Sequence, residues 1–495
     1  MSRPGVTITR SESPPTRSAP TDIGPLFMVG ITGRGNAADA RTPIRSLSEW
    51  VAKFGVRADS PFLYDAAEFY FKEGGRQIFT SRTFGPAPVE ATINIFDQAG
   101  SVDPGDIALV ATAKSPGAWA NTMRYAILAG DAGGEFKIQL TDTADSSVDE
   151  TSPSLVDRAA AVAWATAESD LIDLTLGASN EDPRVVAASG TTQFAGGTDD
   201  SGSATDATWL AAVNQFTRDL GPGQITFPGM TTAARHAQII NHAQTYNRVG
   251  ILDAPDTGTK ATLLAVEAGI TAGNANSKRF GALFAPWVVV PGLTSGTTRT
   301  VPPSAIVAGI MSRNDGRGVG SNQPSAGALG ESITALSLSQ TAFSDADRED
   351  LNEANVNLLR ELYGGIRIYG YRTLTDPTTD AIWVNLANVR LFMEITAKGD
   401  AIGERFVFRQ LDGRRHTCSE YGGELTSMLL PYWEAGALYG DSPNNAFFVD
   451  VGESVNTDVS MAAGYLKASI RLKLSEFAEE VVLDLVKSRS TETIE

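Results

Sequence analysis

The sequence has very few of the side chains on which metal binding and proton transfer usually depend. Of its 495 residues, one is a cysteine, Cys418, and three are histidines, His236, His242 and His416. A single cysteine excludes an intrachain disulfide and a cysteine-based zinc cluster, and three histidines leave little for acid–base chemistry. We therefore expect neither a cofactor nor a metal site.

Long apolar runs are also missing, and no stretch approaches the length of a membrane span. The first residues, MSRPGVTITRSESPP, start polar and lack the apolar segment of a secretory signal. We expect a soluble protein, made in a cytoplasm and without membrane insertion.

Basic residues are outnumbered by acidic ones. The chain has 40 Lys and Arg against 58 Asp and Glu, which gives a formal net charge of −18. A general nucleic-acid binder needs a basic surface, so direct nucleic-acid binding is not expected. An acidic surface keeps a protein soluble and monomeric until a stronger contact assembles it.

What the chain does contain is apolar patterning for several domains. A length of 495 residues exceeds a single core and predicts two to four domains. An apolar strand at 26–31, a capping box from Ser46 to Glu49, a helix from Pro61 and a strand at 77–84 give α/β order. Residues 93–199 are instead short β runs between Gly, Asp and Pro turns, with one helix near 155–168.

Beyond residue 200 the α/β pattern returns. The spacing predicts helices at 205–219, 231–246 and 259–272, one fully buried strand from Phe280 to Val290, and a strand at 364–374. A helix around 386–396, a helix from Cys418 to Tyr439 and strands at 446–451 and 465–474 follow. The last strand, 480–487, is apolar on both faces, which suggests burial against something besides its own sheet.

These patterns predict a multidomain protein of α/β and α+β class. We expect an N-terminal extended arm at 1–21, an α/β middle domain at 22–92 plus 200–372, a β-rich insertion domain at 93–199 and an α+β C-terminal domain at 373–495. For the first segment, an arm with one short strand at Val6–Thr9 and a disordered terminus both fit the sequence.

No stretch predicts an active site. Gly33–Ala38 resembles a dinucleotide fingerprint, but the capped helix starts too late for its N-terminus to meet a pyrophosphate, so a loop is favoured. Gly316–Gly320 lacks the lysine of a phosphate-binding loop. His236 is expected at a helical surface position, and His416 and Cys418, two residues apart, would not face each other on a helix.

A series of short stretches resembles the contractile tail sheath family of phages. The order of these stretches along nearly the whole chain carries the resemblance, while residues 122–200 match loosely and Ala120 stands where the family more often has glycine. The stretches are Arg3–Val6, Phe27–Gly30, Pro43–Ser46, Trp50–Gly55, Phe71–Arg76, Ala113–Asn121, Ala285–Trp287, Val301–Ser304, Ala308–Val319, Asn355–Asn357, Gly364–Leu374, Trp433, Gly436–Gly440 and Phe447–Val449.

The resemblance implies a structural subunit, not an enzyme, and a middle domain of subtilisin-like topology without a catalytic set. Sheath subunits form stacked rings around an inner tail tube, and they contract when the baseplate triggers, driving the tube through the host envelope for genome delivery. Expected partners are further copies of the chain, the tube, the baseplate and the tail terminator. The expected location is the virion tail, after assembly in the host cytoplasm.

The resemblance also implies that arms of neighbouring subunits add strands to one C-terminal sheet. The candidate arm residues are Val6, Thr7, Ile8 and Thr9 at one end and Val481, Val482, Leu483, Asp484, Leu485 and Val486 at the other. Strand addition relies on main-chain hydrogen bonds and suits such segments. Arg390 and Lys398 are expected to face the tube.

Three alternatives stay open at this point. A sheath from a phage-derived bacteriocin or an extracellular injection system would have the same subunit sequence features. A subtilisin-like hydrolase would need an assembled Ser/His/Asp site in a pocket. A surface-layer or adhesion protein would need a secretion signal.

Overall fold

The computed structural model describes residues 21–477, apart from residues 59, 100–102, 146–147, 257, 272–274 and 319. Both candidate arms, Val6–Thr9 and Val481–Val486, lie outside the described residues. The chain divides into two compact units, with the boundary between Ala397 and Lys398. Each unit is described by itself below.

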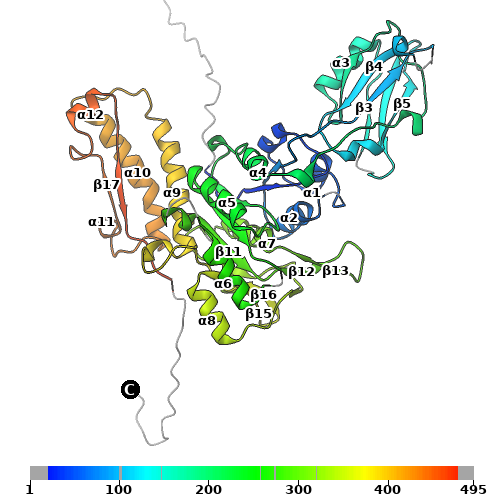
Figure 1. Cartoon of the computed structure of the whole chain (residues 1–495). Helices are drawn as coiled ribbons and strands as arrows, with labels where there is room; N and C mark the ends of the chain where they lie inside the picture. The colour runs from blue at the N-terminus through cyan, green and yellow to red at the C-terminus, as the bar shows by residue number, and fades with distance from the viewer. Residues whose placement is uncertain are drawn as a thin grey trace, which may run out of the picture. The chain divides into compact units, whose positions relative to one another are not determined.

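A seven-stranded sheet forms the centre of the first unit (Figure 1). Its neighbouring strands pair in parallel, except for β16, which pairs antiparallel with β15. In spatial order the strands are β16 (Gly365–Ile368), β15 (Val356–Leu362), β11 (Gly281–Ala285), β10 (Arg248–Asp253), β9 (Gly223–Thr226), β1 (Leu26–Gly30) and β2 (Ile78–Arg82).

Helices cover both faces of this sheet, which explains why its strands read as continuous apolar runs. Successive side chains of a strand point to opposite faces. Phe27 and Val29 of β1 accordingly belong to one core cluster, and Leu26 and Met28 to another. The first cluster includes residues of α4 (Asp206–Val213), α5 (Ala233–Thr245), α6 (Lys260–Gly269) and α8 (Asp345–Glu353), and the second residues of α1 (Leu47–Phe54), α2 (Pro61–Lys72) and α7 (Ser304–Gly316).

The helix start predicted at Ser46 is confirmed, and the predicted capping box is formed in part. The Ser46 hydroxyl accepts a hydrogen bond from the Glu49 amide at 3.2 Å. The Glu49 carboxylate, however, accepts from the amide of Arg45, at 2.8 Å, one residue before the position of an ideal capping box. Helix α1 then ends at Gly55, whose φ of 93° suits glycine.

The single strand predicted from Phe280 to Val290 is wrong. The run is divided into β11, in the large sheet, and β12 (Val288–Pro291), which pairs with β13 (Thr298–Val301) and β14 (Ser337–Leu338) in a separate sheet. Pro286 lies between them and has no N–H to continue a ladder. Composition alone showed only that the whole run is buried.

Helix α7 was missed by the sequence patterning. It is buried from Ser304 to Asn314, on all sides. A helix that is buried all round has no polar face, so the helical period on which the other assignments depended is absent.

The insertion between β2 and β9 has its own sheets, drawn in cyan in Figure 1. One contains β3 (Thr92–Phe96), β4 (Ile107–Ala113) and β8 (Ile172–Leu176), and the other β5 (Met123–Ala129), β6 (Phe136–Asp142) and β7 (Asp149–Thr151). With α3 (Arg158–Ala167) they enclose a core cluster that contains no residue of the seven-stranded sheet. Strands β3 to β8 confirm the short β runs expected in residues 93–199.

The second unit is built from helices and one small sheet. Helix α9 (Leu386–Glu404) crosses the boundary between the units in sequence, and α10 (His416–Glu434), α11 (Pro443–Ala446) and α12 (Asp458–Ala462) follow. Its sheet consists of β17 (Phe447–Asp450) and β18 (Ser469–Leu472). The helix predicted from Cys418 to Tyr439 and the strands predicted at 446–451 and 465–474 are therefore present, and each is shorter than predicted.

Candidate functional site

The polar cluster that most resembles the Ser/His/Asp triad of a hydrolase lies at the carboxyl end of β10. Asp253 accepts from the Ser304 hydroxyl and the Ser304 amide, both at 2.8 Å, and from the Gly229 amide at 3.0 Å. His236 Nε2 lies 3.1 Å from the backbone oxygen of Asp253. Among the described residues no hydrogen bond joins Ser304 to His236, although a nucleophile must contact its base.

The side chains of this cluster are all buried, which also explains their proton affinities. Burial raises the pKa of the Asp253 carboxyl to about 6, against the hydrogen bonds from Gly229 and Ser304. Burial lowers the pKa of His236 to about 4. The surface position predicted for His236 is therefore wrong, because α5 packs this side chain against β10. The cluster connects β10 to the start of α7 and does not form a substrate site.

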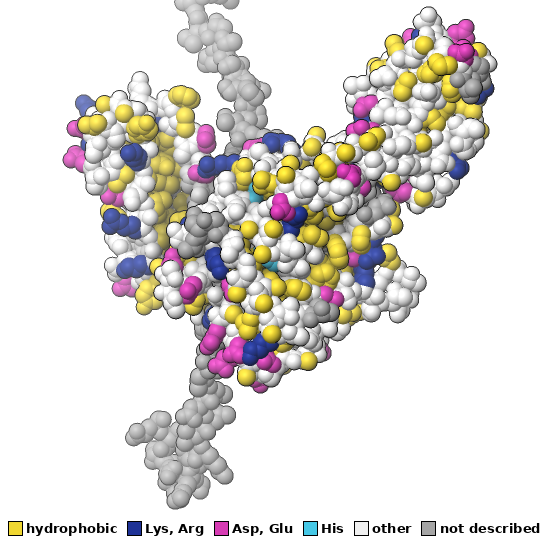
Figure 2. Space-filling model, in the orientation of Figure 1, with side chains coloured by type: hydrophobic (Ala, Val, Ile, Leu, Met, Phe, Trp, Pro, Cys, Tyr) yellow, Lys and Arg dark blue, Asp and Glu magenta, His cyan; other side chains and the backbone are white. Residues whose placement is uncertain are grey.

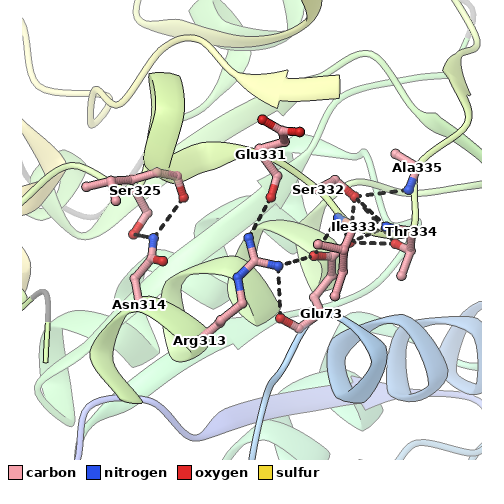
Figure 3. Close-up of polar contacts among 10 residues, drawn as sticks. Glu73, Arg313, Asn314, Ser325, Glu331, Ser332, Ile333, Thr334 and Ala335 are labelled. Carbon is pink, nitrogen blue, oxygen red and sulfur yellow. Dashed lines mark hydrogen bonds and ion pairs between the residues drawn. The ribbon is translucent and has the colours of Figure 1, made fainter. Parts of the chain in front are cut away.

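A second buried cluster surrounds Glu73, directly after α2 (Figure 3). The Glu73 carboxylate accepts from Arg313 Nη1 at 2.7 Å, and from the amides of Ile333 and Thr334 at 3.1 and 3.0 Å. Hydroxyls of Ser332 and Thr334 donate to the same carboxylate. Because every neighbour donates to Glu73, the carboxylate has no spare acceptor position for a substrate. The cluster fixes residues 332–335 against α2 and α7.

The remaining candidate residues do not assemble a reactive site either. His416 is the exposed first residue of α10, whereas Cys418 is buried. Within the described parts of the chain, no three His, Cys, Asp or Glu side chains are placed to hold a metal ion. In those same parts, no helix is both long and apolar enough to cross a membrane.

In the described part of the second unit, one edge of the small sheet has no partner strand. The Lys473 amide donates to the Ala446 oxygen, and the Lys473 oxygen accepts from the Tyr439 amide. The backbone N–H and C=O groups of Lys473 therefore point toward the β17 side of the strand. Because residues of a strand alternate in direction, Arg471 and Ser469 face β17 as well. The N–H and C=O groups of Ile470, Leu472 and Leu474 then point the other way, where no residue in the described part of the chain pairs with them.

The two faces of this sheet differ in character. On the inner face Leu466, Ala468 and Ile470 pack against a core of Ile402 in α9, Phe406 just after α9 and Leu425 in α10. The outer face alternates with it and carries Lys467, Arg471 and Lys473 beside Phe448, which is 54% exposed. A two-stranded sheet alone is marginal in water, so the packing on the helices supplies its stability.

The residues expected to face a tube lie in different surroundings. Arg390 is completely buried, and its guanidinium contacts the Asp315 carboxylate at 2.5 Å and the Tyr371 hydroxyl at 3.4 Å. Lys398 is half-buried and donates to the Tyr432 hydroxyl at 2.7 Å. Arg390 thus connects α9 to α7 in the interior of the unit. A tube contact by either Arg390 or Lys398 stays a prediction.

Charges elsewhere are mixed. On the face drawn in Figure 2, dark blue and magenta side chains are interspersed. Ion pairs occur among the described residues, as between Lys72 and Glu68 and between Lys137 and Asp131. The open sheet edge differs from these surfaces in two ways. In the described part of the chain its backbone groups are unpaired, and it lies beside the basic outer face with Lys467, Arg471 and Lys473.

Comparison with known proteins identifies the class of fold. No family model and no curated protein sequence matches the chain. Solved structures do match. A sheath tail protein from Listeria innocua has a TM-score of 0.61 at 13% identity, with 88% of this chain and 90% of that one covered. A sheath tail protein from Desulfitobacterium hafniense has a TM-score of 0.58 at 16% identity, with 90% and 93% covered.

A third match comes from an assembled particle. The sheath complex of an extracellular contractile injection system, in its contracted state, has a TM-score of 0.57 at 14% identity, with 99% of this chain and 98% of that one covered. The likeness of fold therefore extends over nearly the full length of each protein. The chain has the mixed α/β multidomain fold of contractile sheath proteins, as the resemblance implied.

Proposed function

We propose that the chain is a structural subunit of a contractile tail sheath, which polymerises around a tail tube and contracts to drive it through the host envelope for genome delivery. The observation that carries the proposal is the fold likeness to sheath proteins over 88–99% of the chain. The absence of a Ser–His contact at Asp253, among the described residues, favours a structural role over a hydrolase. The subtilisin-like topology of the middle domain and the four domain ranges given above belong to the same proposal.

The open edge of β18 is the proposed site of assembly. It offers the six backbone groups of Ile470, Leu472 and Leu474, and an added strand would satisfy them. Two segments of the sequence are suited to add strands, Val6–Thr9 and Val481–Val486. The second contains Asp484, close to Glu479 and Glu480, and the outer face of β18 is basic.

Charge complementarity therefore assigns the C-terminal segment of a neighbouring copy to the β18 edge. Cross-strand pairs of opposite charge stabilise a sheet by roughly 0.2–1 kcal/mol each, which selects the register while backbone bonds supply the affinity. The N-terminal segment, with Arg3 and Arg10 at its ends, is assigned to the outer edge of β17, where Asp450 lies. Helical rings of copies linked in this way would contract together.

The partner inside such rings would be a tail tube, with the baseplate and the terminator at the two ends. Lys398 is the better candidate for a tube contact, because this residue is only half-buried while Arg390 is completely buried. The energy of contraction would come from additional surface buried between subunits, without a nucleotide.

Negative-stain electron microscopy of the purified full chain tests the proposal. We expect striated tubes or stacked rings from the unaltered protein. Deletion of residues 1–20 should leave folded monomer and abolish the tubes, because one strand of each assembled sheet is lost. Tubes of normal appearance from the deletion variant would refute the arm assignment, and monomers alone from the full chain, even with a co-expressed tube protein, would contradict the sheath proposal.

A sheath of a phage-derived bacteriocin or an extracellular injection system is the second candidate. It is favoured by the match to the injection-system sheath. Genes for a capsid next to the gene of this chain would indicate a phage, and their absence would indicate the second candidate.

A further inference from the structure

The insertion has its own core, so something other than shared apolar packing must hold it on the seven-stranded sheet and its helices. Two connecting segments lead into and out of it. They run side by side, with the Val89 amide donating to the Thr198 oxygen at 2.8 Å and the Thr92 amide to the Ala195 oxygen at 3.0 Å. A two-stranded connection of this kind can bend and twist. Further contacts at its base decide whether the insertion moves independently.

Arg82 is the first of these contacts. It ends β2, at the rim of the seven-stranded sheet, and its side chain is completely buried. Its Nη1 donates to the Pro116 oxygen of the insertion at 2.6 Å, and its Nη2 lies 3.6 Å from the carboxylate of Asp199 on the outgoing segment. One guanidinium thus holds both the insertion and the segment that leaves it.

Arg34 is the second contact, from the loop after β1. Its Nη2 donates to the Val51 oxygen of α1 at 2.9 Å, while its Nη1 lies 3.6 Å from the Asp145 carboxylate of the insertion. The guanidinium also lies 5.6 Å from the centre of the Trp119 ring, within the range of a cation–π contact. The side chain is 3% exposed.

The backbone around these arginines is packed too closely to slide. Gly117 has a φ of +139°, and a Cβ there would lie 2.9 Å from the Gly33 oxygen. Asn121 exchanges two hydrogen bonds with Gly197 of the outgoing segment, at 2.9 and 2.8 Å. The Gly35 amide donates to the Ser115 hydroxyl at 3.2 Å. The glycine-rich stretch after β1 is therefore a docking loop for residues 115–121.

We propose that Arg34 and Arg82 form a clamp that makes the insertion and the seven-stranded sheet move as one rigid body. Planar guanidinium groups suit this task, because their donors are fixed in direction and each arginine bonds to both sides of the junction. In a sheath, the insertion would then follow every rotation of its subunit and could not act as a separate swinging arm. The proposal does not depend on the sheath function, since it concerns the isolated chain.

Distance measurements between two spin labels test the clamp in the full chain. One label is placed at Ala132→Cys, in an exposed turn of the insertion, and one at Glu349→Cys, on the exposed face of α8, in a Cys418→Ala background. We expect one narrow distance distribution in the parent and a broad one in the Arg34→Ala/Arg82→Ala variant. Lys137→Ala is the control. It removes a cation of the insertion that pairs with Asp131 and not with a residue of the junction, so the distribution should stay narrow.

A broad distribution in the parent, or an unchanged width in the double variant, would overturn the proposal. Because loss of two buried arginines can impair folding, Asp145→Asn gives a milder second variant that removes only one ion pair. Hydrogen exchange at the amides of Val89 and Gly197 should then become about tenfold faster in Arg82→Ala, while the amides of β10 keep their protection. Unchanged exchange at both junction amides would contradict the clamp.

Discussion

The largest and the smallest sheet differ in whether residues beside them pair with their edge strands. In the seven-stranded sheet, Ile44 bridges to Ile78 beside β2, and Glu331 bridges to Arg367 beside β16. In the two-stranded sheet, one whole edge of β18 has no partner among the described residues. Open edges are normally avoided because they promote aggregation. The difference favours our proposal that the first sheet stabilises the fold and the second serves assembly.

Proline substitutions on β18 would break this comparison most strongly. Leu472→Pro removes an N–H that points to the open edge, so we expect assembly to be abolished while the monomer loses about 1 kcal/mol of stability. Arg471→Pro removes an N–H that faces β17, and it should destabilise the monomer by about 3 kcal/mol. Electron microscopy and urea unfolding measure the two effects. Tubes from Leu472→Pro would show that the β18 edge is not the site of assembly.

Glu73→Ala would weaken the cover over the β16 edge of the seven-stranded sheet. Glu73 holds residues 332–335, and the Ser332 amide donates to the Ile366 oxygen of β16. Loss of the carboxylate leaves the buried Arg313 without its counter-charge, so we expect a loss of about 3–5 kcal/mol in urea unfolding. Lys72→Ala is the matched control, because it removes an exposed lysine from an ion pair with Glu68, and it should cost less than about 0.5 kcal/mol. Equal effects of the two variants would contradict the role given to Glu73.

The pH dependence of unfolding would sharpen the account of the central sheet. Burial lowers the pKa of His236 to about 4 and that of His242 to about 3, where the charge of Arg248 contributes, and raises the pKa of Asp253 to about 6. Between pH 4 and 6 the unfolded chain binds protons at both histidines, and the folded chain binds one at Asp253. These groups therefore make stability rise with pH by about 1.4 kcal/mol per unit.

Asp253→Asn removes the opposing proton and should steepen this rise, whereas His242→Gln should flatten it. Urea unfolding at a series of pH values between 4 and 6.5 measures the slopes. Identical slopes in the two variants would show that the three side chains do not control stability in this range. The control is Lys72→Ala, whose slope should equal that of the unaltered protein.

Much of the fold could be predicted from local patterns. The start of α1 at Ser46 and the short strands within residues 93–199 depend on neighbouring residues, and they were found where expected. The strand break at Pro286 and the buried α7 were missed, because burial on all sides removes the periodicity that distinguishes strand from helix. His236 was misplaced for a related reason, since a polar side chain gives no sign that another element covers it.

The site shows the same division. The sequence itself determined that the chain has two terminal segments of strand-like pattern, only three histidines and an alternating strand at 465–474. Which edge of that strand is open was decided only by the tertiary structure, because it depends on residues 437–450 folding back along one side of β18. Likewise, only the fold brings Arg34 and Arg82 to the insertion, since contacts between residues far apart in sequence leave no local pattern.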